Sequence, residues 1–256
     1  MQELQAIWAS PLTEGLSNPE LVWLVLTSAL ASFVTAAMGI GGGILLLVVM
    51  AGILPPLALI PVHGLVQLGS NANRALMTRT HIYWPMVLRF SLGALLGALI
   101  ASQILVQLPV DWIQRAVAVF ILYMVWGPKP KKLALSGLRT LFAGSLTTLI
   151  SMFVGATGPL VAAFIHRMDK DKLSTTATFS ACMSFQHMTK AAVFGAVGFS
   201  FTDWLLPILA MMAAGAIGTW LGLKLLNRIP AHLFRRGFAT LVTLLALRLL
   251  WQSFSA

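Results

Sequence analysis

Long apolar stretches separated by short polar turns dominate the sequence. They run approximately over residues 21–54, 57–77, 84–107, 112–126, 138–165, 173–197, 204–226 and 233–252. A helix needs about 20 mainly apolar residues to cross the roughly 30 Å hydrocarbon core of a bilayer, and most of these stretches reach or approach that length. The pattern therefore predicts an all-α, polytopic membrane protein.

A basic linker at residues 127–137 divides the chain. It begins Gly-Pro-Lys-Pro-Lys-Lys, which combines helix breakers with a run of charges. Four apolar stretches lie on each side of it. We therefore divide the sequence into an N-terminal extension (1–20), a first membrane repeat (21–126), the linker (127–137) and a second membrane repeat (138–256).

The two halves resemble each other. VTAAMGIGGG, residues 34–43, lies 116 positions before ISMFVGATGP, residues 150–159, which places Gly39 over Gly155. At the same offset Asn71, Asn73 and Arg74 fall on His187, Thr189 and Lys190, and at 121 to 122 positions Pro85, Gly93, Pro109 and Arg115 fall on Pro207, Gly215, Pro230 and Arg236. Such an internal duplication is the common building plan of secondary transporters.

Glycine-rich breaks interrupt the first apolar stretch of each half. Backbone groups released by a break must be satisfied by protein or by water in a cavity, so two breaks at matching positions indicate a binding site. The alternative is close helix packing through small residues, which we favour for the pairs Gly93–Gly97 and Gly218–Gly222. The break residues expected at the site are Gly39, Gly41, Gly42, Gly43, Gly155, Thr157, Gly158 and Pro159.

The distribution of charge predicts an orientation. The N-terminus and the turns at Asp111 and Asp203 are acidic, whereas residues 74–89, 129–139, 166–172 and 224–236 are basic. Basic loops face the cytoplasm in membrane proteins. All basic loops lie inside only if the first stretch of each half turns back at its glycines. Each half then crosses three times, and we expect an inverted repeat with a broken, re-entrant first segment in each half.

Composition agrees with a membrane environment. Hydrophobic residues make up 58% of the chain and charged residues only 9%, against about a quarter in soluble domains. The net charge of +10 is spread between apolar stretches, so nucleic-acid binding is not expected. The single cysteine, Cys182, excludes an intrachain disulfide and a cysteine-based metal centre. We expect Trp84, Trp112, Trp126 and Trp204, at stretch boundaries, to anchor at the lipid headgroups.

Polar and basic side chains form a stripe within the second and sixth stretches. The second stretch carries His63, Gln67, Ser70, Asn71 and Arg74 on one helix face, and the sixth carries Ser180, Ser184, Gln186, His187, Thr189 and Lys190. All seven carboxylates lie at or beyond the stretch ends. Polar groups inside the membrane usually face a bundle interior or a wet cavity. The alternative is that Arg74 and Lys190 extend to the interface while the amides pack between helices.

A cavity with two cations, amide and hydroxyl donors and no acid is suited to an oxyanion, and helix N-termini starting at the breaks would add to that preference. Besides the break residues, we expect substrate contacts from Gln67, Asn71, Asn73, Arg74, Ser184, Gln186, His187 and Lys190. His187 and His63 are candidates for proton coupling, or alternatively hydrogen-bonding core residues. No nucleotide-binding or hydrolase motif is present, so we expect no cofactor, no metal and no enzyme activity.

The chain resembles the sulfite exporter TauE/SafE family of membrane permeases over nearly its whole length. The likeness rests on SFVTAAMGIGGGILLLVVM, the turn between Pro55 and Pro61, the Asn71-x-Asn73-Arg74 element and MFVGATGPLVAAF in the second half. It implies a multi-pass permease of the cell inner membrane for sulfur-containing anions such as sulfite, sulfoacetate or related organosulfonates. The second break reads GATGP, unlike the glycine-rich first break, and His187 stands where the first half has Asn71. These departures leave the identity of the anion open.

These observations favour a secondary transporter of a small sulfur-containing anion, working by alternating access at a site between the repeats. A passive anion channel and a membrane-embedded enzyme are the alternatives. The lipid bilayer and the anion are the expected partners. Transport direction, coupling ion and oligomeric state do not follow from the sequence.

Overall fold

A computed structural model describes residues 16–39, 41–105, 111–127, 137–165, 170–226, 239–248 and 250–251. Most of the expected N-terminal extension and linker, residues 1–15 and 128–136, therefore lie outside the described residues. All regular structure in the described part is helical, which confirms the all-α prediction.

The helices match the apolar stretches closely. They are α2 (Asn18–Met38), α3 (Gly42–Ala51), α4 (Pro56–Met77), α5 (Trp84–Leu105), α6 (Asp111–Trp126), α7 (Gly137–Val154), α8 (Gly158–Ile165), α9 (Lys172–Ala196) and α10 (Leu205–Lys224), with short 3₁₀ turns η1 (Arg79–His81) and η2 (Thr202–Trp204) and a helix at Ala239–Arg248. The first and fifth stretches are each split in two, as the glycines predict.

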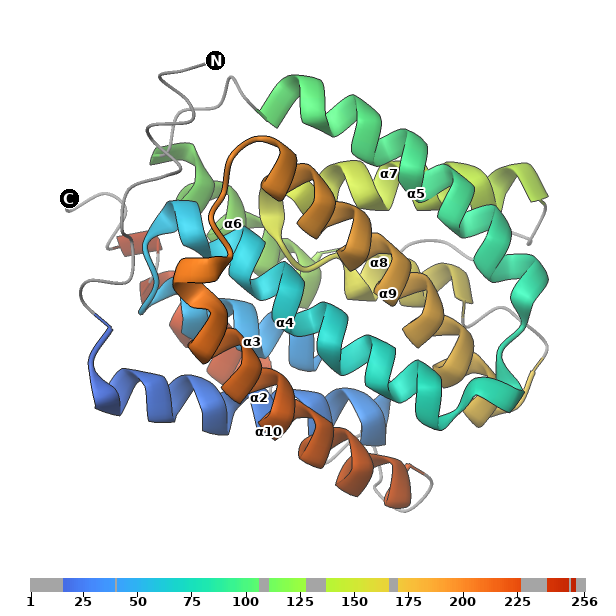
Figure 1. The fold of residues 1–256 in the computed structure, drawn as a ribbon, viewed down its shortest axis with the longest axis horizontal. Coiled ribbons are helices and arrows are strands. Elements are labelled where there is room, and N and C mark those ends of the chain that lie inside the picture. Colours follow the sequence, from blue (N-terminus) through green and yellow to red (C-terminus); the bar gives the residue numbers. More distant parts are fainter. Residues whose placement is uncertain are drawn as a thin grey trace.

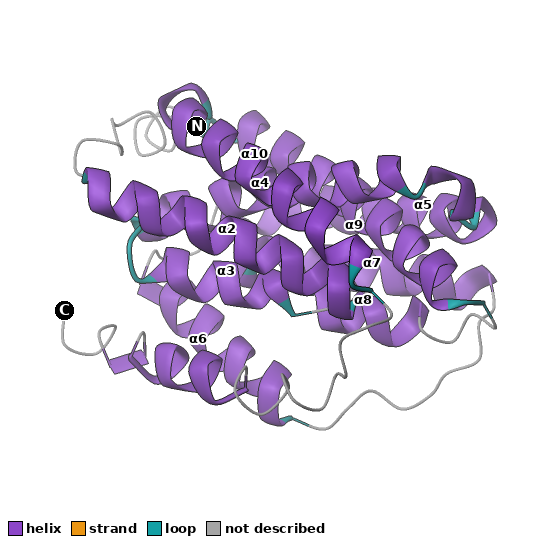
Figure 2. Cartoon of the chain, turned by 90° about the horizontal axis from the view of Figure 1, so that it is seen from below, coloured by secondary structure: helices purple, strands orange, loops and turns teal. Residues whose placement is uncertain are grey.

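Two central helices lie between two outer pairs. Helices α4 and α9 pack on each other, while α2 pairs with α10 and α5 pairs with α7 on either side (Figures 1 and 2). Helices α2, α5 and α7 and residues 202–224 are each long and apolar enough to cross a membrane. Helices α4 and α9 have 22 and 25 residues, so they are also long enough, but they carry the polar stripes and bury them at the centre.

Glycines allow the outer pairs to pack closely. A Cβ added to Gly97 of α5 would overlap the carbonyl oxygen of Ser145 on α7, and one added to Gly218 of α10 would overlap that of Ala29 on α2. The packing interpretation of these glycine pairs is thereby confirmed. The two contacts also correspond, because Ser145 follows Ala29 by 116 positions and Gly218 follows Gly97 by 121.

The chain reverses at the first break. Gly42 lies directly against Ala31 and Thr35 of α2. A continuous helix would carry residue 42 about 10 Å beyond Thr35, at 1.5 Å per residue, so α3 must run back along α2. In Figure 1 the α2–α3 hairpin begins and ends at one end of the bundle, and the α7–α8 hairpin begins and ends at the opposite end.

Helices α4 and α9 run antiparallel. The ring centroids of His63 and His187 lie 6.3 Å apart, and Arg74, further along α4, donates to Ser180, which comes earlier in α9, at 3.3 Å. Residue numbers therefore rise along one helix as they fall along the other. The two helices that occupy corresponding places in the two halves therefore point in opposite directions.

One tryptophan does not behave as an interfacial anchor. Trp84 and Trp126 are 55% and 68% exposed, as expected, but Trp204 is only 1% exposed. The η2 turn directs its ring into the main apolar cluster, so apolar packing and not headgroup contact positions it. The prediction was wrong for Trp204, and the side chain of Trp112 lies outside the described residues.

The opposite ends of the bundle can be assigned to the two sides of the membrane. In a Cys182→Ser background, Thr80→Cys and Lys170→Cys should resist a membrane-impermeant thiol reagent added to intact cells. Thr80 follows α4 and Lys170 precedes the antiparallel α9, so both lie at the end of the bundle that carries the basic turns. Thr202→Cys, at the other end, should react. Labelling of Lys170→Cys but not Thr80→Cys would show that α7 and α8 do not form a re-entrant hairpin.

Candidate functional site

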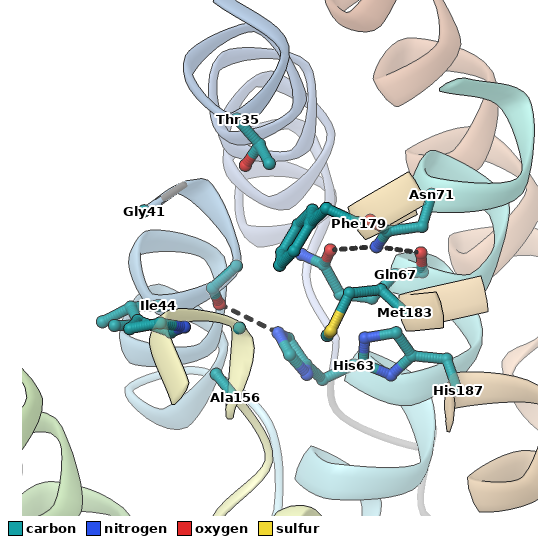
Figure 3. Close-up of a pocket in the computed structure, with 13 residues that line it drawn as sticks. Thr35, Gly41, Ile44, His63, Gln67, Asn71, Ala156, Phe179, Met183 and His187 are labelled. Atoms are coloured by element: carbon teal, nitrogen blue, oxygen red, sulfur yellow. Dashed lines mark hydrogen bonds between the residues drawn. The ribbon is translucent and has the colours of Figure 1, made fainter. Parts of the chain in front are cut away.

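A pocket forms where the two breaks meet the central helices. It encloses about 380 Å³ of space not filled by protein atoms, including the part open at its mouth. Figure 3 shows these side chains converging from α2, α3, α4, the second break and α9. The lining residues are Thr35, Gly41, Gly43, Ile44, His63, Gln67, Asn71, Ala156, Gly158, Pro159, Phe179, Met183 and His187.

The two long walls of the pocket are built from corresponding positions. Helix α4 contributes His63, Gln67 and Asn71, and α9 contributes Phe179, Met183 and His187. Each α9 residue follows its α4 counterpart by 116 positions. The wall from the first half is entirely polar, whereas the wall from the second half is apolar except for its histidine.

Both breaks begin with the same backbone geometry. Gly39 has a φ of 91° and its N–H donates to Thr35 O at 2.8 Å, and Gly155 has a φ of 84° and donates to Ser151 O at 3.0 Å. Positive φ is the left-handed region, which glycine adopts without the steric cost that a Cβ imposes. Glycine at these two positions therefore ends α2 and α7 in the same way.

Short helices restart on the pocket side of each break. Gly41 O accepts from the first turn of α3, and Thr157 O accepts at the corresponding positions of α8. The first amides of a helix have no intrahelical acceptor and form the positive end of its dipole. Gly43 and Gly158 place these first turns of α3 and α8 in the pocket lining, where they favour an anion.

A chain of hydrogen bonds runs from a buried cation to the pocket. Arg74, which is 0% exposed, donates to Asn71 Oδ1 at 3.3 Å, and Asn71 Nδ2 donates to Gln67 Oε1 at 3.3 Å. The whole Gln67 amide lies beside Gly43, with Nε2 3.5 Å and Oε1 3.7 Å from where a Cβ on that glycine would lie, and Nε2 is the atom that the chain of hydrogen bonds leaves available. Arg74 thus orients an amide donor into the pocket from behind its wall.

The second buried cation lies beside the second break. Lys190 is 0% exposed, and its Nζ donates to Gly155 O at 2.7 Å. A lysine at this place interacts favourably with the negative end of α7. Its stem passes Gly64 of α4, where a Cβ would lie 2.8 Å from Lys190 Cδ, so the absence of a side chain at position 64 leaves room for the lysine. Both cations are therefore held inside the bundle and do not reach its surface.

The two histidines lie on opposite walls. His63 Nε2 contacts Gly43 O at 2.9 Å, and because a carbonyl only accepts, Nε2 must carry the proton. A neutral His63 then offers its buried Nδ1 as an acceptor, and this atom has no partner within the described part of the chain. Nδ1 of His187 is likewise buried without a partner there. Both histidines therefore retain capacity to bind a proton or a donor group.

The structure brings together about half of the expected site. Gly41, Gly43, His63, Gln67, Asn71, Gly158, Pro159 and His187 line the pocket, whereas Gly39, Gly42, Asn73, Arg74, Gly155, Thr157, Ser184, Gln186 and Lys190 do not. Several of the second group support it from behind, as Gln186 does by donating to Thr157 Oγ1 at 2.7 Å. The hydroxyl of Ser184 donates to its own helix, to Ser180 O at 2.7 Å.

Sequence reasoning missed the apolar part of the lining. Phe179 and Met183 precede His187 by eight and four positions, so they share its helix face. The sequence shows this spacing, but a search limited to polar residues does not select Phe179 and Met183. Thr35, Ile44 and Ala156 also line the pocket. In the described residues no group of three or more His, Cys, Asp or Glu side chains could hold a metal ion.

Comparison with known families identifies the chain. The family model described as "Sulfite exporter TauE/SafE" matches residues 24–249, nearly the whole sequence. The protein belongs to this family. No curated protein and no solved structure shows a significant match. Membership implies an integral membrane transporter of sulfur-containing anions.

Gly42 and Gly158, which occupy corresponding positions at the two breaks, should respond differently to replacement by alanine. A Cβ on Gly158 would meet only Phe179 Cζ at 3.6 Å, an ordinary contact, so Gly158→Ala should fold normally but reduce pocket space and weaken anion binding. Gly42→Ala would drive a methyl group into the α2 backbone and should lower stability by roughly 1–3 kcal/mol. Thermal unfolding and anion titration of purified protein distinguish the two effects. Equal loss of stability in both variants would contradict the assignment.

Proposed function

We propose that this protein is a secondary transporter of the inner membrane that carries sulfite or a small organosulfonate by alternating access. Its central site would lie between two inverted repeats, residues 21–126 and 138–256. Family membership supplies the class of substrate. The geometry of the pocket supplies the reasons for a moving, two-sided site.

The inverted repeat is supported by three features. Helices α4 and α9 run antiparallel, the two hairpins open at opposite ends of the bundle, and the outer pairs α2–α10 and α5–α7 use corresponding glycine contacts. An axis that relates the halves in this way would lie in the membrane plane. Inverted-topology repeats of this kind place substrate sites near the bilayer midplane, at broken helices.

The observation that carries the proposal is the construction of the pocket from matched positions. Residues 63, 67 and 71 face residues 179, 183 and 187 across it, so each repeat supplies one wall. A site shared in this way changes its exposure when one repeat moves against the other. A fixed pore would not need a broken helix from each repeat at the same site.

Anion recognition follows from the groups that surround the pocket. The Gln67 amide and the first turns of α3 and α8 present donors, and Arg74 and Lys190 add positive charge behind them. Helices α4 and α9 contain no carboxylate that would neutralise these cations. Two buried charges are costly unless an anion compensates them, so their presence favours an anionic substrate.

The unequal walls suit a substrate with two unlike ends. A sulfonate group would accept hydrogen bonds from the α4 wall and the helix N-termini, and a short organic substituent would contact Phe179 and Met183. Sulfite, which has no such substituent, would use only the polar wall. We therefore expect a small organosulfonate to bind more tightly than sulfite.

Transport against a gradient tests the function. Purified protein in liposomes should accumulate labelled sulfite or sulfoacetate above the external concentration when a pH difference or a potential is imposed. If protons couple through the histidines, His187→Gln should flatten the pH dependence of the rate. Equilibration without accumulation under every imposed gradient would identify a passive channel instead.

Replacing the central amide should weaken binding. Gln67→Met makes position 67 identical to its counterpart Met183 and removes the donor that Arg74 orients through Asn71. A hydrogen bond to a charged partner is worth about 1.5 to 3 kcal/mol, so affinity should fall roughly 10- to 150-fold. Met183→Leu, which keeps an apolar side chain of similar volume, is the matched control and should bind within a few fold of the unmodified protein. Unchanged affinity in Gln67→Met would remove this amide from the site.

A further inference from the structure

Arg74 and Lys190 occupy corresponding positions but make different contacts. Lys190 donates to Gly155 O, the carbonyl at the end of α7 in its own half. The corresponding carbonyl for Arg74 is Gly39 O, at the end of α2, since 39 and 155 are also separated by 116 positions. Arg74 instead donates to Ser70, Asn71 and, across the central crossing, Ser180, each at 3.3 Å.

This difference is informative because α2 and α7 end in the same way at the two breaks. Gly39 and Gly155 share a positive φ and the same helix-ending hydrogen bond, so both breaks present a comparable helix end. The cations differ only in which partner each has taken. Lys190 is therefore hydrogen-bonded to the break of its own half, and Arg74 is not.

Two inverted repeats with different conformations imply a second state in which the conformations are exchanged. If the first repeat adopts the present arrangement of the second, Arg74 bonds to Gly39 O. Lys190 then leaves Gly155 and turns to the central crossing, as Arg74 does now. The two states open the shared pocket to opposite sides of the membrane, because the repeats have opposite orientations.

We propose that Arg74 and Lys190 are alternating latches, each fastening the helix break of its own repeat in one of the two transport states. The structure holds the state in which Lys190 is fastened and Arg74 is released. This inference rests on the proposed alternating access, but it assigns the cations a role that substrate binding does not require. Both are positioning residues, since neither lines the pocket.

Burial explains why each latch side chain has two distinct hydrogen-bonding positions and not a continuous range of positions. Both side chains are 0% exposed, so each cation must have hydrogen-bond acceptors in every populated state. In the structure Lys190 uses the carbonyl at its break, and Arg74 uses hydroxyl and amide groups at the crossing. Exchange of partners is therefore coupled to movement of the break against α4 or α9.

The test is the exposure of the pocket to each side. A single cysteine is introduced as Met183→Cys in a Cys182→Ser background, and its labelling by an impermeant thiol reagent is compared from the two sides of oriented vesicles without substrate. Lys190→Met should shift the ratio of the two labelling rates about tenfold or more in one direction, and Arg74→Met by a similar factor in the other.

Further variants distinguish a latch from a packing role. The Arg74→Met/Lys190→Met double variant should return to within about threefold of the starting ratio, because opposite shifts cancel. Lys190→Arg keeps a donor for Gly155 O and should retain the starting ratio. If Lys190→Met does not accumulate in the membrane, Lys190→Gln, which is shorter and uncharged, should shift the ratio in the same direction. Shifts of the same sign, or none, would overturn the proposal.

The result can be separated from the transport function. Labelling without substrate does not depend on which anion is carried, so opposite shifts support the latch even if sulfite and sulfoacetate are not transported. Labelling of Met183→Cys from one side only, in the Cys182→Ser background and in both single variants built on it, would exclude alternating access itself and the latch with it.

Discussion

A helix that breaks inside a membrane releases amide and carbonyl groups that lipid cannot bind, and those groups must find partners in the protein or in a polar cavity. The protein meets this requirement twice, at breaks that begin with Gly39 and Gly155, and both glycines have a positive φ and the same helix-ending hydrogen bond. Each break turns the positive end of a short helix toward the centre. The polar faces of α4 and α9 lie opposite these ends, and the outer helix pairs flank the two central helices on either side.

The pocket is symmetric in backbone and asymmetric in chemistry. Duplication supplies two walls of the same shape, but one has His63, Gln67 and Asn71 where the other has Phe179, Met183 and His187. The two sets of residues lie on opposite walls of the pocket, so a difference between α4 and α9 becomes a difference between two sides of the ligand. Substrate orientation can thus arise without any asymmetry in the fold.

Much of this architecture was predictable from the sequence because its signals are local. Apolar length gave the helices, and glycine breaks and the 116-residue offset gave the two hairpins and the central pair. The sequence could not show that Arg74 and Lys190 stay behind the pocket wall, because that depends on neighbours such as Ser180 and Gly155 that are distant in the chain. Phe179 and Met183 were missed for a different reason, since apolar residues in an apolar helix carry no distinguishing signal.

The outer helix pairs also determine how the protein is assembled. Helix α2 packs on α10, with Ser28 donating to Met211 O across 183 positions of sequence at 2.7 Å. At a synthesis rate of about 5 to 20 residues per second, α2 is made roughly 10 to 40 s before its partner exists. During that interval the close-packing face of α2 contacts only lipid or a temporary companion. The α2–α10 pair therefore forms only after residues 205–224 have been made, and α2 waits for its partner until then.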